Sequence, residues 1–162
     1  MERQFSQSSS RAVTTVGAMT REQDLVQQFR GDGDAIREAM FELAGGWSAT
    51  VLREAVLTDA AFAALVEGLS DPHPRVRWWC ISLLDHAPDA RAITAIGPLL
   101  DDPVPRVRRN AAHALGCLAC KPDWCGTLAP ETVTKLEALA TSDENARVRR
   151  DASIALLSVR SS

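Results

Sequence analysis

Apolar residues recur along most of the chain at spacings of three and four, which places them on one face of a helix. No window shows the strict alternation of apolar and polar residues that indicates a half-buried strand, so we expect no sheet. Pro98 interrupts one of the periodic windows, which predicts a kink or a late start because proline lacks the amide donor. The pattern therefore predicts an all-α chain. The expected helices cover residues 59–70, 74–86, 89–101, 105–119, 130–141 and 145–160.

The N-terminal part is less regular. Residues 1–20 are rich in Ser and Thr and poor in apolar residues, which predicts a disordered tail and makes Met19 an alternative to Met1 as the start. A single domain is expected over residues 21–160. Within it, residues 34–57 predict a degenerate helix pair. Asp34 is the expected N-cap, because its carboxylate can accept an amide hydrogen of the first turn.

One seven-residue stretch occurs three times, each time before a predicted helix. It reads Asp-Pro-His-Pro-Arg-Val-Arg, then Asp-Pro-Val-Pro-Arg-Val-Arg, then Asp-Glu-Asn-Ala-Arg-Val-Arg. Val107 stands 31 positions after Val76, and Val148 stands 41 positions after Val107. A helix pair recurring at such intervals predicts an α-solenoid, because one pair is too thin to bury its own apolar face and must stack on its neighbours. The clear repeats cover about residues 59–86, 89–119 and 130–160.

Composition and charge narrow the classes of function. An apolar share of 46% and a charged share of 24% are ordinary for a globular chain. The formal net charge of −3 does not favour nucleic acid or a membrane surface as the partner. No apolar run approaches a membrane span and no secretion signal is recognisable, so the expected location is the cytoplasm. Four cysteines in such a chain indicate reduced thiols or a metal site and not a disulfide framework.

The repeated stretch and the residues after it resemble HEAT repeats. The pattern Asp-x-x-x-Arg-Val-Arg followed by Ala-Ala-x-Ala-Leu-Gly is similar to the short type named after phycobilisome lyases, and residues 110–116 are the best match. The resemblance covers about residues 59–160 and implies an armadillo-like α-α superhelix of antiparallel helix pairs. It also implies a structural ladder of ion pairs between repeats. The implied members are Asp71, Arg77, Asp102, Arg108, Asp143 and Arg149.

The second helix of each repeat carries Arg or Trp opposite its core face. With Ala111 at zero and 100° per residue, Val107 and Leu115 fall on the core side, and Arg106 and Arg109 fall on the opposite side. In HEAT solenoids that side tends to line the concave surface. Guanidinium groups beside an exposed aromatic ring are typical of interaction surfaces. The alternative is a solvated face whose long side chains cover apolar neighbours. The candidate partner-binding residues are Arg75, Trp78, Arg106, Arg109, Arg147 and Arg150.

A cluster of possible metal ligands follows the second repeat. His113 and Cys117 stand one helical turn apart, Cys120 stands nearly two turns from His113, and Cys125 follows a Lys-Pro-Asp turn. Three thiolates and one imidazole would suit tetrahedral zinc. The spacing matches no standard zinc finger, and incidental thiols are the alternative. We therefore predict no cofactor, with zinc on these four residues as the competing hypothesis.

No enzymatic site is indicated. Some HEAT-type proteins are deoxyhypusine hydroxylases, which carry His-Glu pairs in successive repeats, whereas His73, His86 and His113 are followed here by Pro, Ala and Ala. We predict a non-enzymatic binding or scaffold module that engages an acidic protein surface. The alternatives are a nucleic-acid binder similar to the HEAT-like DNA glycosylases, and a metal- or thiol-dependent regulator.

Overall fold

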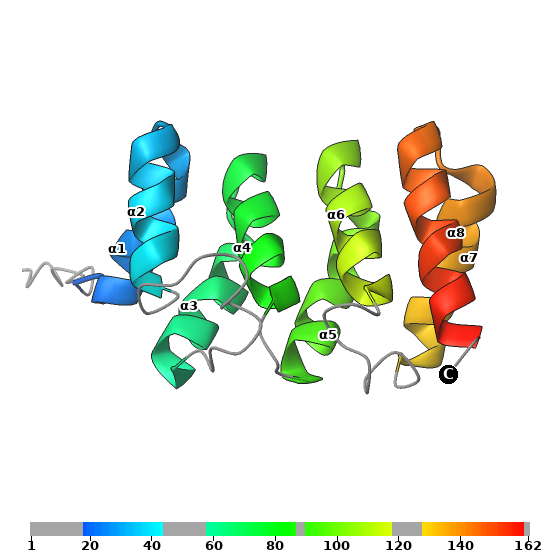
Figure 1. Cartoon of the computed structure of the whole chain (residues 1–162), viewed down its shortest axis with the longest axis horizontal. Helices are drawn as coiled ribbons and strands as arrows, with labels where there is room; N and C mark the ends of the chain where they lie inside the picture. Colours follow the sequence, from blue (N-terminus) through cyan, green and yellow to red (C-terminus); the bar gives the residue numbers. More distant parts are fainter. Residues whose placement is uncertain (1–17, 44–57, 87–89, 118–127, 161–162) are drawn as a thin grey trace, which may run out of the picture.

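The computed structural model describes residues 18–43, 58–86, 90–117 and 128–160, and every regular element in these ranges is a helix. The elements form a row of stacked helix pairs (Figure 1). The predicted all-α solenoid is therefore confirmed. In chain order the elements are α1 (Arg21–Gln27), η1 (Gln28–Arg30), α2 (Gly33–Leu43), α3 (Asp59–Gly68), α4 (Pro74–His86), α5 (Ala90–Ile96), η2 (Gly97–Asp101), α6 (Pro105–Gly116), α7 (Pro130–Ser142) and α8 (Ala146–Arg160).

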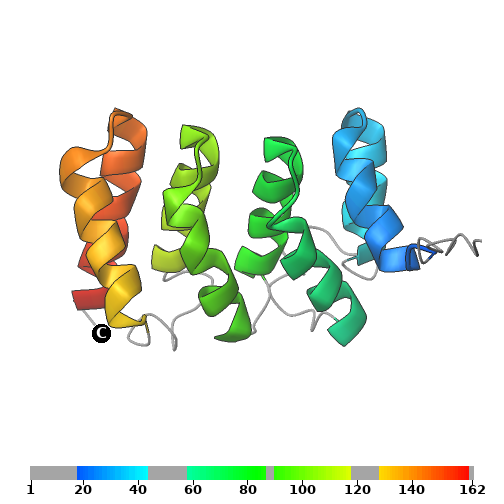
Figure 2. The same ribbon diagram turned by 180° about the vertical axis from the view of Figure 1, so that it is seen from behind.

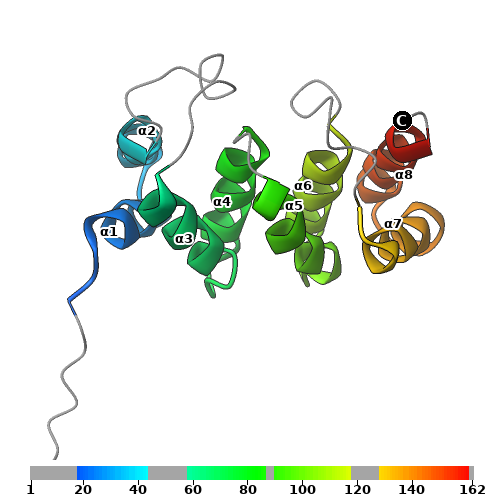
Figure 3. The same cartoon turned by 90° about the horizontal axis from the view of Figure 1, so that it is seen from below.

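The helices form two layers. One layer holds α1, α3, α5 and α7, and the other holds α2, α4, α6 and α8 (Figure 3). Figure 2 shows the first of these layers from its outer side. We call the pairs units 1 to 4, so that unit 2 is α3 with α4, unit 3 is α5 and η2 with α6, and unit 4 is α7 with α8. In the described part of the chain, no helix is long and apolar enough to cross a membrane.

Local sequence explains where several helices end. The helix expected over 89–101 changes at Gly97 into the 3-10 segment η2, next to Pro98, which cannot donate a backbone hydrogen bond. The helix expected over 105–119 ends at Gly116, because Cys117 has an extended backbone with φ −78° and ψ 91°. The expected ligand Cys117 thus follows the helix directly, and residues 118–127, with Cys120 and Cys125, lie outside the described residues.

Unit 1 is formed by α1 and η1 with α2. Asp32, and not Asp34, caps α2, because its Oδ1 accepts the backbone N–H groups of Asp34 and Ala35 at 3.0 Å each. The sequence-based choice of Asp34 as the N-cap was therefore wrong by two residues. The degenerate pair expected over 34–57 shares α2 with this unit, and its remaining residues lie outside the described part, as do residues 1–17.

A continuous apolar core runs through the row. Phe29, Leu65, Leu84, Leu100 and Leu136, which come from all four units, are completely buried at 0% exposure. The valine of each Arg-Val-Arg triplet is also buried. Since every unit buries its apolar side against its neighbours, no unit has a core of its own, as is general for solenoids.

Two helices of the second layer approach each other closely at Gly116. A Cβ atom at this position would lie 2.3 Å from the Cα atom and 2.4 Å from the Cβ atom of Ala155 in α8. Only a glycine fits such a contact. Gly116 therefore sets the distance between α6 and α8, and with it the packing of unit 4 on unit 3.

Candidate binding surface on the second helices

A ladder of ion pairs connects the turns of successive units. Arg77 donates through Nε and Nη2 to the two carboxylate oxygens of Asp102 at 2.6 and 2.9 Å, and through Nη1 to the carbonyl of Asp71 at 2.8 Å. Arg108 donates in the same way to Asp143 at 2.7 and 3.1 Å. Each guanidinium group therefore holds its own turn and the turn of the next unit, in the bidentate geometry that favours arginine over lysine.

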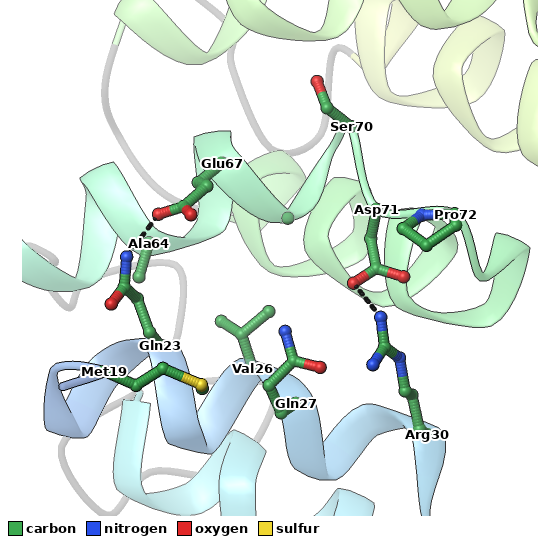
Figure 4. Close-up of a pocket in the computed structure, with 11 residues that line it drawn as sticks. Met19, Gln23, Val26, Gln27, Arg30, Ala64, Glu67, Ser70, Asp71 and Pro72 are labelled. Atoms are coloured by element: carbon green, nitrogen blue, oxygen red, sulfur yellow. Dashed lines mark hydrogen bonds and ion pairs between the residues drawn. The ribbon is translucent and has the colours of Figure 1, made fainter. Parts of the chain in front are cut away.

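The two ends of the ladder differ from its middle. Arg30, the last residue of η1, donates to Asp71 at 2.6 Å and takes the place of a triplet arginine in unit 1 (Figure 4). Sequence reasoning missed Arg30 because it precedes the Gly-Asp-Gly turn instead of following it. Arg149 donates to the backbone carbonyls of Asp143 and Glu144 at 2.7 and 3.2 Å. No carboxylate of a described residue accepts a hydrogen bond from Arg149.

Burial and hydrogen bonding act in opposite directions on the ladder carboxylates. Burial alone would raise the pKa of Asp143, but hydrogen bonds from Arg108 and from the backbone of Asn145 outweigh it, so the pKa lies below its ordinary value. The pKa of Asp71 is lowered in the same way, because burial is outweighed by hydrogen bonds from Arg30 and from the turn backbone. Both groups are therefore more acidic in the folded chain than in the unfolded one.

These lowered pKa values predict that acid weakens the stack. A carboxylate with a lowered folded-state pKa stabilises the fold fully above its unfolded pKa of about 3.9, and this contribution disappears as the pH falls through the folded value. Urea titrations should therefore give a lower midpoint at pH 3 than at pH 6. The Asp143→Asn variant should start from a lower midpoint at pH 6 but lose less between the two pH values. An equal loss in both proteins would contradict this role of Asp143.

Trp78 and Arg106 stand at the centre of a hollowed surface on α4 and α6. The guanidinium carbon of Arg106 lies 4.7 Å from the centre of the Trp78 ring, within cation–π distance. Both residues border a hollow of about 430 Å³ that also touches Arg75. A second hollow of about 240 Å³ lies against the same two residues and extends to Arg109. The two hollows therefore adjoin. We use the name arginine–tryptophan surface for Arg75, Trp78, Arg106, Arg109, Arg147 and Arg150.

A buried aspartate holds two of these arginines. Asp151, which is 6% exposed, accepts from Nε of Arg109 at 2.7 Å and from Nε of Arg150 at 3.0 Å. Burial alone would raise the pKa of Asp151, but these hydrogen bonds outweigh it and lower the pKa below its ordinary value. Arg109 and Arg150 are thus fixed in place, whereas Arg106 and Arg147 are exposed and form no ion pair with a described residue.

The wall of the larger hollow is supported from both sides. The rings of Trp78 and Trp79 meet edge to face with their centres 4.6 Å apart. The centre of the Trp79 ring lies 6.3 Å from the centre of the Phe29 ring in unit 1. The side-chain amide of Asn110 in α6 donates to the Trp78 carbonyl at 2.9 Å. On the outer edge, Arg75 donates to the carbonyl of Gly31 at 2.8 Å. Contacts from units 1 and 3 therefore hold the unit 2 residues of the surface in position.

Two of the expected zinc ligands lie beside a carboxylate that the sequence did not single out. Nε2 of His113 is 4.0 Å from Oδ2 of Asp85, and the ligand atoms of Asp85, His113 and Cys117 all lie within 4.8 Å of one another. Asp85 belongs to unit 2, and helical spacing within α6 cannot reveal a contact from another unit.

Stacked helix pairs that share one core and a ladder of turn contacts define the protein as an α-solenoid. A family model described as HEAT repeats matches residues 62–157, and the chain belongs to the HEAT repeat family. No curated protein matches the chain in sequence.

Solved structures share the fold. Human deoxyhypusine hydroxylase, determined in complex with glycerol, has a TM-score of 0.56 and 23% identity, and the match covers 87% of this chain and 44% of the hydroxylase. Two engineered proteins have TM-scores of 0.53 and 0.54 at 22% and 23% identity, covering 87% and 89% of this chain and 63% and 65% of theirs. The chain spans less than two thirds of each of these proteins, and at such identity the likeness concerns the fold alone.

Proposed function

We propose that this chain is a non-enzymatic protein-binding module whose arginine–tryptophan surface receives an acidic segment of a protein partner. The observation that carries the proposal is the position of Trp78 and Arg106, which border both adjoining hollows. An aromatic ring beside guanidinium groups offers an apolar anchor together with charge complementarity. HEAT repeats generally mediate protein interactions, which agrees with this proposal.

The charge of the surface favours an acidic partner. The surface has five arginines, and the one carboxylate that pairs with any of them among the described residues is that of Asp151. The surface is therefore positively charged, although the whole chain has a formal net charge of −3. The positive field is therefore local and acts at short range, since salt screens it beyond about 8–10 Å. A nucleic acid would be held mainly by many phosphate contacts along a basic stripe, and the acidic net charge gives less support to that alternative.

The surface is also largely preorganised. Asp151 fixes Arg109 and Arg150, and Asn110 connects α6 to the backbone of Trp78. Side chains that are already ordered lose less conformational entropy when a partner binds. The proposal includes a cytoplasmic location, where the four cysteines would remain reduced. It includes no catalytic role, because none of the three histidines is followed by the Glu of a His-Glu pair.

The test reverses two exposed charges that no described carboxylate holds. The Arg106→Glu and Arg147→Glu double variant should lose at least about tenfold in affinity for a glutamate-rich peptide, measured by fluorescence anisotropy, and in capture of partner proteins from lysate identified by mass spectrometry. Because both side chains are exposed, the free energy of unfolding should change by only about 0.5 kcal/mol for each substitution.

The matched control carries the same charge change in the other layer of helices. Arg21→Glu with Arg91→Glu alters α1 and α5, where both arginines are exposed and pair with Glu42 and Asp59. Once circular dichroism has shown that this variant folds, it should leave peptide affinity and capture unchanged. Equal losses in the two double variants would indicate a bulk charge effect, and unchanged binding in the first would remove the arginine–tryptophan surface as the binding site. Salt-sensitive retention of labelled DNA, lost only in the first variant, would support the nucleic-acid alternative instead.

A further inference from the structure

Three side chains with different donor atoms meet where α4 and α6 end. Asp85 is the last residue but one of α4, His113 lies in the last turn of α6, and Cys117 is the C-cap of α6. Their carboxylate oxygen, imidazole nitrogen and thiol sulfur lie within 4.8 Å of one another. The group therefore spans units 2 and 3, and its His113 also lines the smaller hollow beside Trp78 and Arg106.

This donor set suits zinc. Zinc accepts thiolate, imidazole and carboxylate ligands, with bonds of about 2.0–2.3 Å, so its ligand atoms stand roughly 3.3–3.8 Å apart. The distance of 4.0 Å between His113 Nε2 and Asp85 Oδ2 is close to this value. The His113 side chain is 58% exposed. Magnesium and calcium prefer all-oxygen sites, so the nitrogen and sulfur donors disfavour both ions.

The surroundings also favour a cation. α4 and α6 run in the same direction, so their C-terminal ends lie at the same edge of the row (Figure 1). The last carbonyl groups of a helix carry partial negative charge, and two such ends lie close to the three donors. The Asp85 side chain is only 6% exposed, and its carboxylate adds a negatively charged ligand oxygen to the group.

From this geometry we infer that Asp85, His113 and Cys117 bind one zinc ion, with a fourth ligand from solvent, and that the ion links unit 2 to unit 3. This inference goes beyond the proposed binding function and does not depend on it. Binding would deprotonate the Cys117 thiol and release its proton to solvent. Because the ligands come from α4 and α6, the ion would cross-link two helices that already meet through packing, the Asn110 hydrogen bonds and the Arg106–Trp78 contact.

Zinc titration of the chelator-treated protein tests the inference. Isothermal titration calorimetry should show one ion per chain, and zinc should raise the melting temperature. His113→Ala and Cys117→Ser should each weaken zinc binding at least about tenfold and abolish the rise in melting temperature. Cobalt substitution gives a second readout, because Cys117→Ser should remove the thiolate-to-cobalt charge-transfer absorption. Asp85 is buried, so Asp85→Asn serves only as a supporting variant after circular dichroism has shown that it folds.

Two controls separate this site from other zinc ligands. His73→Ala removes an exposed imidazole outside the group and should bind zinc like the parent protein. A Cys120→Ser and Cys125→Ser double variant removes the two cysteines that follow Cys117 in the sequence and should also retain one zinc ion. The inference is overturned if the parent binds no zinc, if the double variant loses binding, or if His113→Ala and Cys117→Ser bind as tightly as the parent.

Discussion

Replacing Arg77 with methionine is expected to lower the free energy of unfolding by about 3–5 kcal/mol. The methionine retains the apolar stem but removes the guanidinium group. The Asp102 carboxylate, whose side chain is 2% exposed, would then lose both of its arginine hydrogen bonds and remain charged inside the protein. The carbonyl of Asp71 would lose its donor as well. Urea denaturation monitored by circular dichroism measures this change.

A double-mutant cycle identifies the cause of that loss. Asp102→Asn removes the negative charge but keeps a side-chain oxygen that can accept the Val104 backbone N–H, which now donates at 2.8 Å. Adding Asp102→Asn to Arg77→Met should therefore recover part of the lost stability, since no uncompensated buried charge remains. Arg106→Met removes an exposed guanidinium and should change stability by about 0.5 kcal/mol at most. Similar losses in Arg77→Met and Arg106→Met would contradict the structural role of the ladder.

Replacing Gly116 with alanine should also destabilise the stack, by roughly 1–3 kcal/mol or more. The added methyl group would overlap the Cα atom of Ala155, which is backbone and cannot rotate away, so α6 and α8 would have to move apart. Replacing Ala155 with glycine as well should not restore full stability, because its Cα atom remains. Thermal unfolding of the single and double variants tests both statements.

Gly33 provides the matched control for this prediction. A Cβ atom at Gly33 would meet only the end of the flexible Arg37 side chain, at 3.8 Å. Gly33→Ala should therefore be neutral or slightly stabilising, since alanine favours a helix more than glycine does. A loss of stability at Gly33 as large as at Gly116 would mean that steric contact with α8 is not the cause.

The periodic spacing of apolar residues was sufficient to predict the fold. The buried valines of the three Arg-Val-Arg triplets mark equivalent places in successive units, and the helix pairs follow from them. Helix ends were predicted less well because they depend on local details. Asp32 caps α2 in place of Asp34, and α6 stops before Cys117 because the backbone becomes extended there.

The candidate surface was less accessible to sequence reasoning. A helical wheel places Arg109 on the face opposite the core, but it describes one helix at a time. It cannot show that Asp151 of unit 4 is buried beneath Arg109, or that Asp85 of unit 2 lies beside His113. Contacts between units depend on how far each pair is shifted and rotated against the next, and the period within a helix does not contain this information.

The ladder has a consequence for the way such a chain can change its length. Arg77 and Arg108 each pair with the aspartate of the following turn, so the turns of units 2 and 3 each carry both an aspartate for the arginine before it and an arginine that reaches forward. Among the described residues, Arg149 of unit 4 donates only to its own turn. Duplicating or deleting the gene segment for one whole unit would therefore leave every internal arginine with an aspartate. Arg30 shows that even a unit without the Arg-Val-Arg triplet can supply an arginine to the aspartate of the next unit. Growth by tandem duplication would need no compensating substitution at the new junction, whereas a change of half a unit would separate the pairs.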